Sequence, residues 1–252
     1  HECSSAASDV YKRQDIKISL YSNYKKLILK KRINPLLLNF NKLNFHFSFL
    51  KKYLKSIDKI LFCSVVPNKF IKIKKYFEQI TNKKCYELKK LKIEKLIKIK
   101  VKKNQVGSDR LANAISVLET NKNFIIIDFG TATTFDIVIN KNYIGGVIAP
   151  GVKLSLDNLT NRASLIPKIN LKKIKNVIGK NTSSAIYSGF YLGYNGLIDN
   201  IIKLIIKQTR KKFMIVLTGG LSHLFKNSIN GKVKLDKDLT INGLLKVSDI
   251  IE

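Results

Sequence analysis

One segment of this chain combines carboxylates, hydroxyls and glycine in the way that phosphate and metal binding require. It runs Asp-Phe-Gly-Thr-Ala-Thr-Thr-Phe-Asp from Asp128 to Asp136 and joins two apolar stretches. Gly130 would let backbone N–H groups approach an anion closely, and Asp128 could hold a cation. Hydroxyl donors would come from Thr131, Thr133 and Thr134. The segment suggests a metal–nucleotide site, and the alternative is an ordinary β-hairpin with a glycine turn.

A second glycine-rich turn, Thr-Gly-Gly-Leu at residues 218–221, follows the apolar residues 213–217. Two glycine turns after apolar strands can converge on one nucleotide. Phosphates would then lie near residues 128–131 and adenosine near the second turn. The chain has no Gly-x-x-x-x-Gly-Lys-Ser/Thr motif, which argues against a P-loop kinase.

The sequence Gly-Ser-Asp-Arg at residues 107–110 is another candidate site. Asp109 falls in the first turn of an expected helix, where it could accept the proton of an attacking hydroxyl. Arg110 could clamp a carboxylate through two parallel hydrogen bonds. The alternative is structural, because an aspartate in a first helical turn also complements the helix dipole.

Composition argues against several classes of protein. No stretch approaches the roughly 18 to 20 uncharged apolar residues of a membrane span, and 45% hydrophobic residues suffice for a packed core. Cys3, Cys63 and Cys85 form neither a disulfide framework nor a metal-ligand spacing. They fit a reducing compartment, and we expect a cytoplasmic protein. Three histidines give little support to a zinc cluster or a Ser-His-Asp triad.

The net charge of +30 comes almost entirely from lysine. Excess lysine, isoleucine and asparagine with scarce arginine is typical of AT-rich coding, whereas nucleic-acid sites favour arginine's planar fork. The lysine-rich residues 25–32 and 89–103 could bind polyanions non-specifically. We therefore expect no specific nucleic-acid partner.

Apolar periodicity and turn residues predict an α/β protein. The expected strands are residues 16–21, 60–66, a hairpin at 124–139, 143–148 and 213–217, with a polar turn at 30–32. The expected helices are residues 70–80, one capped by Ser108, one opening at Pro150-Gly151, and 182–207 capped near Thr182 or Ser183.

Three glycines, at positions 189, 193 and 196, fall inside the long expected helix. Each costs about 1 kcal/mol relative to alanine in a helix interior. We expect them to admit another backbone or a ligand at close range.

The first residues differ in composition from the rest. Residues 1–14 contain no initiating methionine, and Met214 is the only methionine of the chain. They also lack the apolar stretch and small-residue cleavage site of a signal peptide. We interpret residues 1–14 as a foreign leader and exclude them from fold prediction.

Taken in order, the motifs resemble those of type III pantothenate kinases, which belong to the acetate kinase/Hsp70/actin superfamily. The resemblance covers nearly everything from residue 15 to the C-terminus. It rests on residues 64–67, 107–114, 128–136, 145–151, 162–167, 179–182, 188–189, 218–221 and 238–244.

This resemblance implies two ribonuclease-H-like domains and a homodimer. We assign residues 15–106 to the N-terminal domain and residues 107–252 to the C-terminal domain. The family's first strand and its Asp-x-Gly-Asn-Thr phosphate loop have no counterpart here, and the leader occupies their place. We therefore expect the chain as written to be nearly inactive.

The resemblance also implies ATP-dependent phosphorylation of the 4′-hydroxyl of pantothenate, the first step of coenzyme A biosynthesis. The implied cofactors besides ATP are Mg²⁺ and a monovalent cation, K⁺ or NH₄⁺. Asp109 would be the proton acceptor, and Asp128 would be the cation ligand. Pantothenate would be bound by Gly107, Ser108, Asp109 and Arg110, together with Thr182, which could act across the dimer interface. ATP would be bound by Gly130, Thr131, Gly219 and Gly220.

Two other functions stay open. One is a non-catalytic homologue that acts as an accessory factor in transcription, and the other is a lysine-rich nucleic-acid-binding protein. The presence of Asp109, Asp128 and Thr131 favours the kinase, because a protein that only binds has no need of all three.

Overall fold

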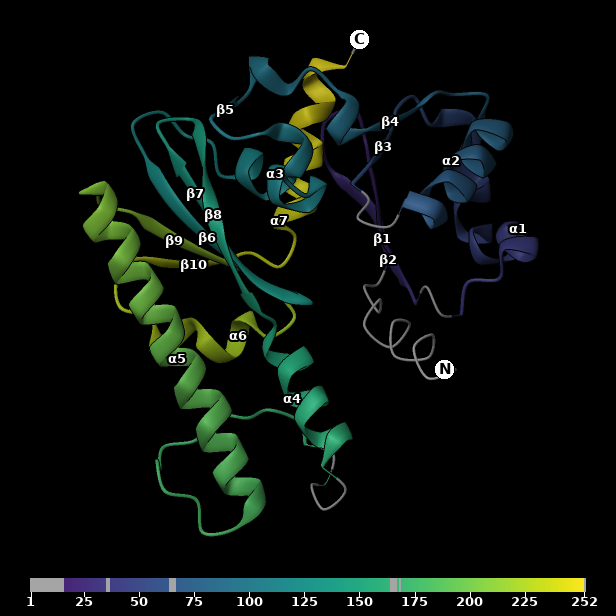
Figure 1. The fold of residues 1–252 in the computed structure, drawn as a ribbon. Helices are drawn as coiled ribbons and strands as arrows, with labels where there is room; N and C mark the ends of the chain where they lie inside the picture. The colour runs from purple at the N-terminus through teal and green to yellow at the C-terminus, as the bar shows by residue number, and fades with distance from the viewer. Residues whose placement is uncertain (1–15, 35–36, 64–66, 164–166, 168, 252) are drawn as a thin grey trace, which may run out of the picture. The chain divides into compact units, whose positions relative to one another are not determined.

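The computed structural model describes residues 16–34, 37–63, 67–163, 167 and 169–251 (Figure 1). The expected leader lies outside the described residues, as do positions 64–66 and 164–166 of the family-like motifs.

The chain forms two compact units. Unit 1 comprises His1–Val117 and Leu239–Glu252, and unit 2 comprises Leu118–Asp238. The division falls after Val117 rather than after residue 106, and the C-terminal segment belongs to unit 1.

Unit 1 is built from short strands and helices. Its strands are β1 (Ile16–Tyr21), β2 (Leu27–Ile33), β3 (Ile60–Phe62), β4 (Cys85–Glu87) and β5 (Lys98–Ile99). Its helices are α1 (Leu43–His46), α2 (Pro67–Thr81), α3 (Ser108–Ser116) and α7 (Leu239–Val247). Its 3₁₀ segments are Phe40–Lys42, Ser48–Ser56, Leu88–Lys90, Ile93–Lys95, Lys103–Gln105 and Ser248–Ile250.

The first hairpin of unit 1 pairs β1 with β2 in antiparallel fashion, while β3 and β4 pair in parallel. The strand expected at residues 16–21 is confirmed. The polar turn expected at residues 30–32 is wrong, because these residues lie within β2 and pair with β1. The chain reverses earlier, where the N–H of Lys25 donates to the carbonyl of Ser22 at 2.8 Å.

Aromatic side chains dominate the core of unit 1. Ile73 and Phe77 bury one face of α2, which confirms the helix predicted at residues 70–80. Phe77 meets Phe47 edge to face, with ring centroids 4.9 Å apart. Cys85 belongs to the same cluster, where burial raises the pKa of its thiol to about 12. This thiol therefore stays protonated at neutral pH.

Close packing of α3 on α7 explains why α3 belongs to unit 1. A Cβ on Gly243 of α7 would lie 1.9 Å from the carbonyl oxygen of Ala112, so a side chain there would block this approach. The fully buried side chain of Asn113 also accepts a hydrogen bond of 2.7 Å from the hydroxyl of Thr240. The contact joins segments that are far apart in the sequence.

Unit 2 is a sheet with helices packed on it. Its strands are β6 (Asn123–Phe129), β7 (Ala132–Ile139), β8 (Asn142–Pro150), β9 (Met214–Gly219) and β10 (Val233–Leu235). Its helices are α4 (Val152–Arg162), α5 (Thr182–Thr209) and α6 (Ser222–Phe225), with a 3₁₀ segment at Lys226–Ser228. The strands lie in the order β10-β9-β6-β7-β8. β9 runs parallel to β6 and β10, and the other pairs are antiparallel. These elements confirm the predicted hairpin, the strand after it and the helix opening at Pro150-Gly151.

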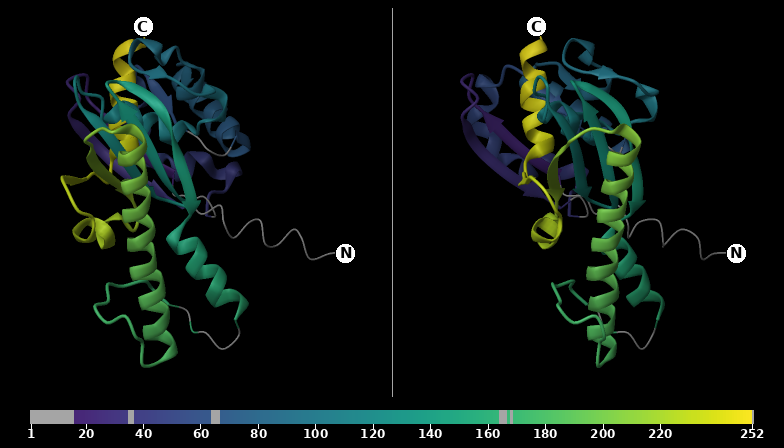
Figure 2. Two further views of the ribbon diagram at one scale, coloured as in Figure 1. Left: turned by 60° about the vertical axis from the view of Figure 1, so that its left-hand side comes forward. Right: turned by 90° about the vertical axis from the view of Figure 1, so that its left-hand side faces the viewer.

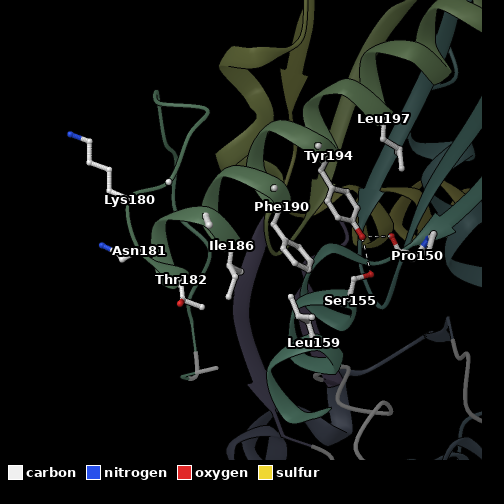
Figure 3. A pocket seen from close by; sticks show the side chains of 14 residues that line it. Pro150, Ser155, Leu159, Lys180, Asn181, Thr182, Ile186, Phe190, Tyr194 and Leu197 are labelled. Carbon is white, nitrogen blue, oxygen red and sulfur yellow. Dashed lines mark hydrogen bonds between the residues drawn. The ribbon is translucent and has the colours of Figure 1, made fainter. Parts of the chain in front are cut away.

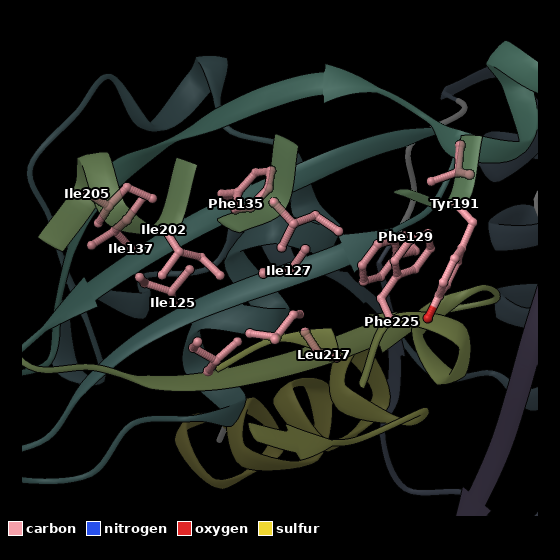
Figure 4. Packing of buried hydrophobic residues seen from close by; sticks show 14 residues of the cluster. Ile125, Ile127, Phe129, Phe135, Ile137, Tyr191, Ile202, Ile205, Leu217 and Phe225 are labelled. Atoms are coloured by element: carbon pink, nitrogen blue, oxygen red, sulfur yellow. The ribbon is translucent and has the colours of Figure 1, made fainter. Parts of the chain in front are cut away.

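The long helix α5 covers one face of this sheet (Figure 4). Strand β6 presents Ile125, Ile127 and Phe129 to it, because alternate residues of a strand point to the same face. The helix contributes Ile198, Ile202 and Ile205 to the same cluster. The ring of Phe129 stacks on Phe225 of α6, with centroids 4.9 Å apart.

A capping box starts α5. The side chain of Asn181 accepts the N–H of Ser184 at 2.9 Å, and the hydroxyl of Ser184 accepts the N–H of Asn181 at 3.1 Å. The cap that was expected near Thr182 or Ser183 is Asn181, the residue before Thr182. Both views of Figure 2 show α4 and the N-terminal part of α5 extending beyond the sheet. Although α5 has 28 residues, no helix in the described part of the chain is long and apolar enough to cross a membrane.

The contact of α5 with the sheet should set the stability of unit 2. Ile198 is fully buried, whereas Ile206 on the same helix is 42% exposed. We expect Ile198→Ala to lower the free energy of unfolding by about 2–5 kcal/mol, because it leaves a cavity. Ile206→Ala should change it by less than about 0.5 kcal/mol. Urea denaturation followed by circular dichroism measures both, and equal losses would contradict this packing.

Candidate active site

Parallel pairing of β6 with β9 brings the two predicted glycine turns together. In this register Asp128 lies beside Thr218, and Phe129 lies beside Gly219. Both strands end at the same edge of the sheet, so the turns at residues 128–131 and 218–221 leave it side by side. The expectation that the two turns converge is confirmed.

Gly219 makes room for a carboxylate where these strand ends meet. Its φ is +87°, and a Cβ there would lie 2.6 Å from the Oδ1 atom of Asp128 and 2.6 Å from the backbone nitrogen of Phe129. A Cβ on Gly220 would meet nothing within 4 Å. Of these two positions, only Gly219 lacks room for a side chain.

The turn between β6 and β7 lies against the N-terminus of α4. Gly130 and Thr131 are exposed, and the N–H of Gly130 donates to the carbonyl of Ala132 at 3.1 Å. This N–H is therefore used inside the turn. A Cβ on Gly151, the N-cap of α4, would lie 2.0 Å from the carbonyl oxygen of Thr131. The N–H groups and dipole of a helix N-terminus favour an anion beside such a turn.

The threonines of β7 point to opposite faces of the sheet. Thr134 is the cross-strand partner of Asp128 and shares its face. Thr133 is the partner of Phe129 and is fully buried, and its hydroxyl has no hydrogen-bond partner among the described residues. The side chain of Thr133, which was expected to offer a hydroxyl donor, lies on the face that α5 covers, opposite to Asp128.

A buried carboxylate follows on the same strand. Asp136 is fully buried, and its oxygens accept hydrogen bonds from the hydroxyls of Tyr143 at 2.6 Å and Thr134 at 3.4 Å. Sequence reasoning gave neither Asp136 nor Tyr143 a role. The sequence did carry one signal for Asp136. It lies two residues after Thr134, and residues two apart share one face of a strand.

Helix α3 of unit 1 carries the other candidate residues. Gly107 is the N-cap, and Ser108 lies inside the helix, buried, with no hydrogen-bond partner for its hydroxyl among the described residues. The expected capping role of Ser108 is therefore wrong. Asp109 is half-buried, and its Oδ1 atom accepts the backbone N–H of Arg110 at 2.9 Å. This hydrogen bond holds the carboxylate at the first turn.

The carboxylate of Asp109 influences a neighbouring thiol. Burial raises the pKa of Cys63 well above its ordinary range, and the charges of Asp109 and then Glu87 raise it further. The thiol therefore stays protonated at neutral pH, which argues against Cys63 as a nucleophile.

Thr182 lines a groove between α4 and α5 in unit 2 (Figure 3). The groove has a volume of about 1020 Å³. Its apolar lining consists of Pro150, Leu159, Ala185, Ile186, Phe190 and Leu197, together with ring carbons of Tyr194. The hydroxyl of Tyr194 lies 2.9 Å from the Oγ atom of Ser155, which ties α5 to α4. Thr182 thus lies beside an apolar groove at the start of α5.

The glycines of α5 have no close neighbour in the described chain. A Cβ on Gly189, Gly193 or Gly196 would meet nothing within 4 Å. The expected close packing is therefore not met within one chain. Gly189 and Gly193 instead form part of the open wall of the groove.

Asp128 and its neighbours fit a hard cation better than a transition metal. No group of three or more His, Cys, Asp and Glu side chains in the described part of the chain could hold a metal ion. Asp128 offers a carboxylate beside the hydroxyl-bearing Thr134, and oxygen ligands of this kind suit Mg²⁺ and K⁺. Further ligands would come from phosphate oxygens and water.

The strands and helices form an α/β fold of the actin-like ATPase type, as predicted. A conserved Baf family protein from Campylobacter jejuni shares the fold over 87% of this chain and 89% of its own, with a TM-score of 0.56 and 18% identity. Component A of (R)-2-hydroxyglutaryl-CoA dehydratase from Acidaminococcus fermentans shares it over 91% and 90%, with a TM-score of 0.51 and 9% identity.

Sequence comparisons identify the family within this class. A family profile described as type III pantothenate kinase matches residues 21–204. The type III pantothenate kinase of Pelagibacter ubique is 58% identical over 226 residues, which cover 90% of this chain and 89% of that protein. One from a Sulfurihydrogenibium species is 37% identical over 222 residues, covering 85% and 84%. The chain belongs to the type III pantothenate kinase family.

Gly219 and Gly220 offer a matched test of the candidate site. Alanine at position 219 would be strained by about 1–3 kcal/mol and would displace Asp128, whereas alanine at 220 has space. We expect Gly219→Ala to weaken ATP binding by about tenfold or more and Gly220→Ala to weaken it less, because alanine at position 220 does not displace Asp128. Isothermal titration calorimetry measures both affinities. Equal affinities would contradict a nucleotide site at these strand ends.

Proposed function

We propose that this chain phosphorylates the 4′-hydroxyl of pantothenate with ATP, the first step of coenzyme A biosynthesis. Membership of the type III pantothenate kinase family supports the kinase activity and both substrates. The structural observation that carries the proposal is the convergence of two glycine turns at one sheet edge, where Asp128 lies against Gly219. Such turns suit the phosphates of a nucleotide.

Unit 2 would bind ATP. The phosphates would lie on Gly130 and Thr131, where the N-terminus of α4 favours negative charge, and the rest of the nucleotide on Gly219 and Gly220. The cations, Mg²⁺ on the phosphates and K⁺ or NH₄⁺ at Asp128, would supply charge neutralisation. Phosphoryl transfer depends mainly on such neutralisation and on positioning, which the backbone of these turns can provide.

Unit 1 would bind and activate pantothenate. Asp109 is held at the first turn of α3, and the packing of α3 on α7 fixes the helix. A carboxylate held in this way can accept the hydroxyl proton during the transfer. Arg110 would pair with the carboxylate of pantothenate. Because the Ser108 side chain is buried, this residue would contribute through its backbone, as Gly107 would.

A homodimer would form through the α4–α5 face of unit 2. Val177 and Ile178, on the segment before α5, are 71% and 85% exposed, and neighbouring exposed apolar groups mark interaction surfaces. Gly189 and Gly193 leave the backbone of α5 open to a close approach. The family resemblance supports a second copy of this chain as the partner, with Thr182 near the interface.

The alternatives have less support. Likeness to the Baf family protein concerns the fold alone, at 18% identity, and does not favour a role in transcription. The 58% identity to a type III pantothenate kinase favours the enzyme over a nucleic-acid-binding protein. A cytoplasmic location is proposed because Cys63 and Cys85 are free thiols, as in a reducing compartment.

The role of Asp109 can be tested by removing its charge. In a chain that carries the family's Asp-x-Gly-Asn-Thr loop ahead of Ile16, Asp109→Asn keeps the size of the side chain but removes the base, so we expect kcat to fall by about 10²–10⁴-fold. ATP affinity should be unchanged, because the proposed ATP contacts lie in unit 2. Asp58→Asn, at an exposed acidic position of unit 1, is the control and should keep full activity. A steady-state assay of phosphopantothenate formation decides, and near-full turnover by Asp109→Asn would exclude the general-base role.

The dimer can be tested by filling the glycine surface of α5. Alanine and leucine at position 193 meet no atom near the Cβ and both favour a helix over glycine by up to about 1 kcal/mol, so folding should not suffer. A close partner would be displaced more by Gly193→Leu than by Gly193→Ala. We expect the dimer dissociation constant to rise in that order in analytical ultracentrifugation. An unchanged dimer in Gly193→Leu would refute this interface, and a monomeric wild type would refute the dimer.

A further inference from the structure

The buried pair Asp136 and Tyr143 has no part in the roles assigned so far. The Oδ1 atom of Asp136 accepts a hydrogen bond of 2.6 Å from the hydroxyl of Tyr143, and both side chains are at most 1% exposed. Its Oδ2 atom accepts a longer hydrogen bond, 3.4 Å, from the hydroxyl of Thr134. Burying a carboxylate costs free energy unless it is well paired. The buried position of Asp136 in the sheet therefore calls for a reason.

The hydrogen bonds of Asp136 lead toward the candidate cation site. Thr134 lies two residues before Asp136 on β7 and directly across from Asp128 on β6, so all three side chains share one face of the sheet. Cross-strand partners have Cβ atoms roughly 4.5–5.5 Å apart. At that separation a single cation can contact both the carboxylate of Asp128 and the hydroxyl oxygen of Thr134.

We propose that Thr134 is a second protein ligand of the cation at Asp128, and that Asp136 and Tyr143 are positioning residues. The proposal rests on the cation site proposed above. A threonine hydroxyl has one proton to donate and two lone pairs to share. Because the proton of Thr134 is directed at Asp136, its lone pairs are left for a cation. Tyr143 holds the other oxygen of Asp136 and so fixes the direction of that acceptor.

This arrangement favours a monovalent cation. Protein sites for Ca²⁺ usually gather several carboxylates, and Mg²⁺ takes most of its ligands from phosphates and water, whereas Asp128 and a neutral hydroxyl bring one negative charge. Asp136 would add a second charge if it faced the cation, but its oxygens are engaged by Tyr143 and Thr134. A K⁺ ion needs oxygen ligands that replace part of its hydration shell, and a hydroxyl can do this without extra charge.

The measurement is the thermal unfolding of the full chain with ADP and MgCl₂ while KCl replaces choline chloride at constant ionic strength. Thr134→Val removes the hydroxyl with little change of shape, and Thr134→Ser keeps it. We expect the K⁺ concentration for half-maximal stabilisation to rise at least about tenfold in Thr134→Val and in Tyr143→Phe, and to stay within about threefold in Thr134→Ser. If Thr134 and Tyr143 had only a structural role, Thr134→Val and Tyr143→Phe would lower the melting temperature equally at every K⁺ concentration.

Asp128→Asn separates this proposal from the one on which it rests. Asp128→Asn should abolish the dependence of the melting temperature on K⁺. If it does so while Thr134→Val leaves the K⁺ midpoint unchanged, Thr134 is not a ligand and the present proposal alone is overturned. If Asp128→Asn keeps the full dependence on K⁺, the cation site itself is wrong. A shifted midpoint in Thr134→Val with an unchanged one in Tyr143→Phe would overturn the positioning role of the buried pair.

Discussion

The candidate site depends on the parallel pairing of β6 with β9. Parallel neighbours end at the same edge of a sheet, so Asp128 and Gly219 meet although they are far apart in the sequence. Both strands are buried along most of their length, so their ends are the first places where polar groups can reach a ligand. The missing side chain of Gly219 gives the carboxylate its space, and Gly151 sets the N-terminus of α4 against the neighbouring turn.

Most elements could be predicted because the sequence marks them locally. Helical spacing identified α2 and α3, and apolar stretches beside glycine turns identified β6, β7 and β9. The faces of these strands could not be predicted in the same way. β6 is apolar at almost every position, so no alternation shows which side α5 will cover. Thr133 and Thr134 therefore looked equivalent, although one is buried under α5 and the other shares the face of Asp128.

The remaining differences between the predictions and the structure have tertiary causes. The lysines and arginine at residues 30–32 resembled a turn, but β2 is mostly exposed and can carry charges within a strand. Ser108 has the chemistry of a cap, yet the helix begins one residue earlier and buries it. The boundary after Val117 follows from the contact of α3 with α7, whose Gly243 signals close packing only once its neighbour is known. Local patterns cannot report such contacts between distant segments.

The proposed reaction explains how the carboxylates of this chain are distributed. Both substrates are anions, so a carboxylate near them repels them. It helps the proposed reaction only where it binds a cation or accepts a proton. Asp128 and Asp109 are proposed for those two tasks, and each is held by the backbone around it. Asp136, on the same sheet face as Asp128, is buried and accepts a hydrogen bond from Tyr143, which would keep its charge from the proposed phosphates. A net charge of +30 over the whole chain attracts anionic substrates at long range, and the tasks proposed for Asp128 and Asp109 are cation binding and proton acceptance.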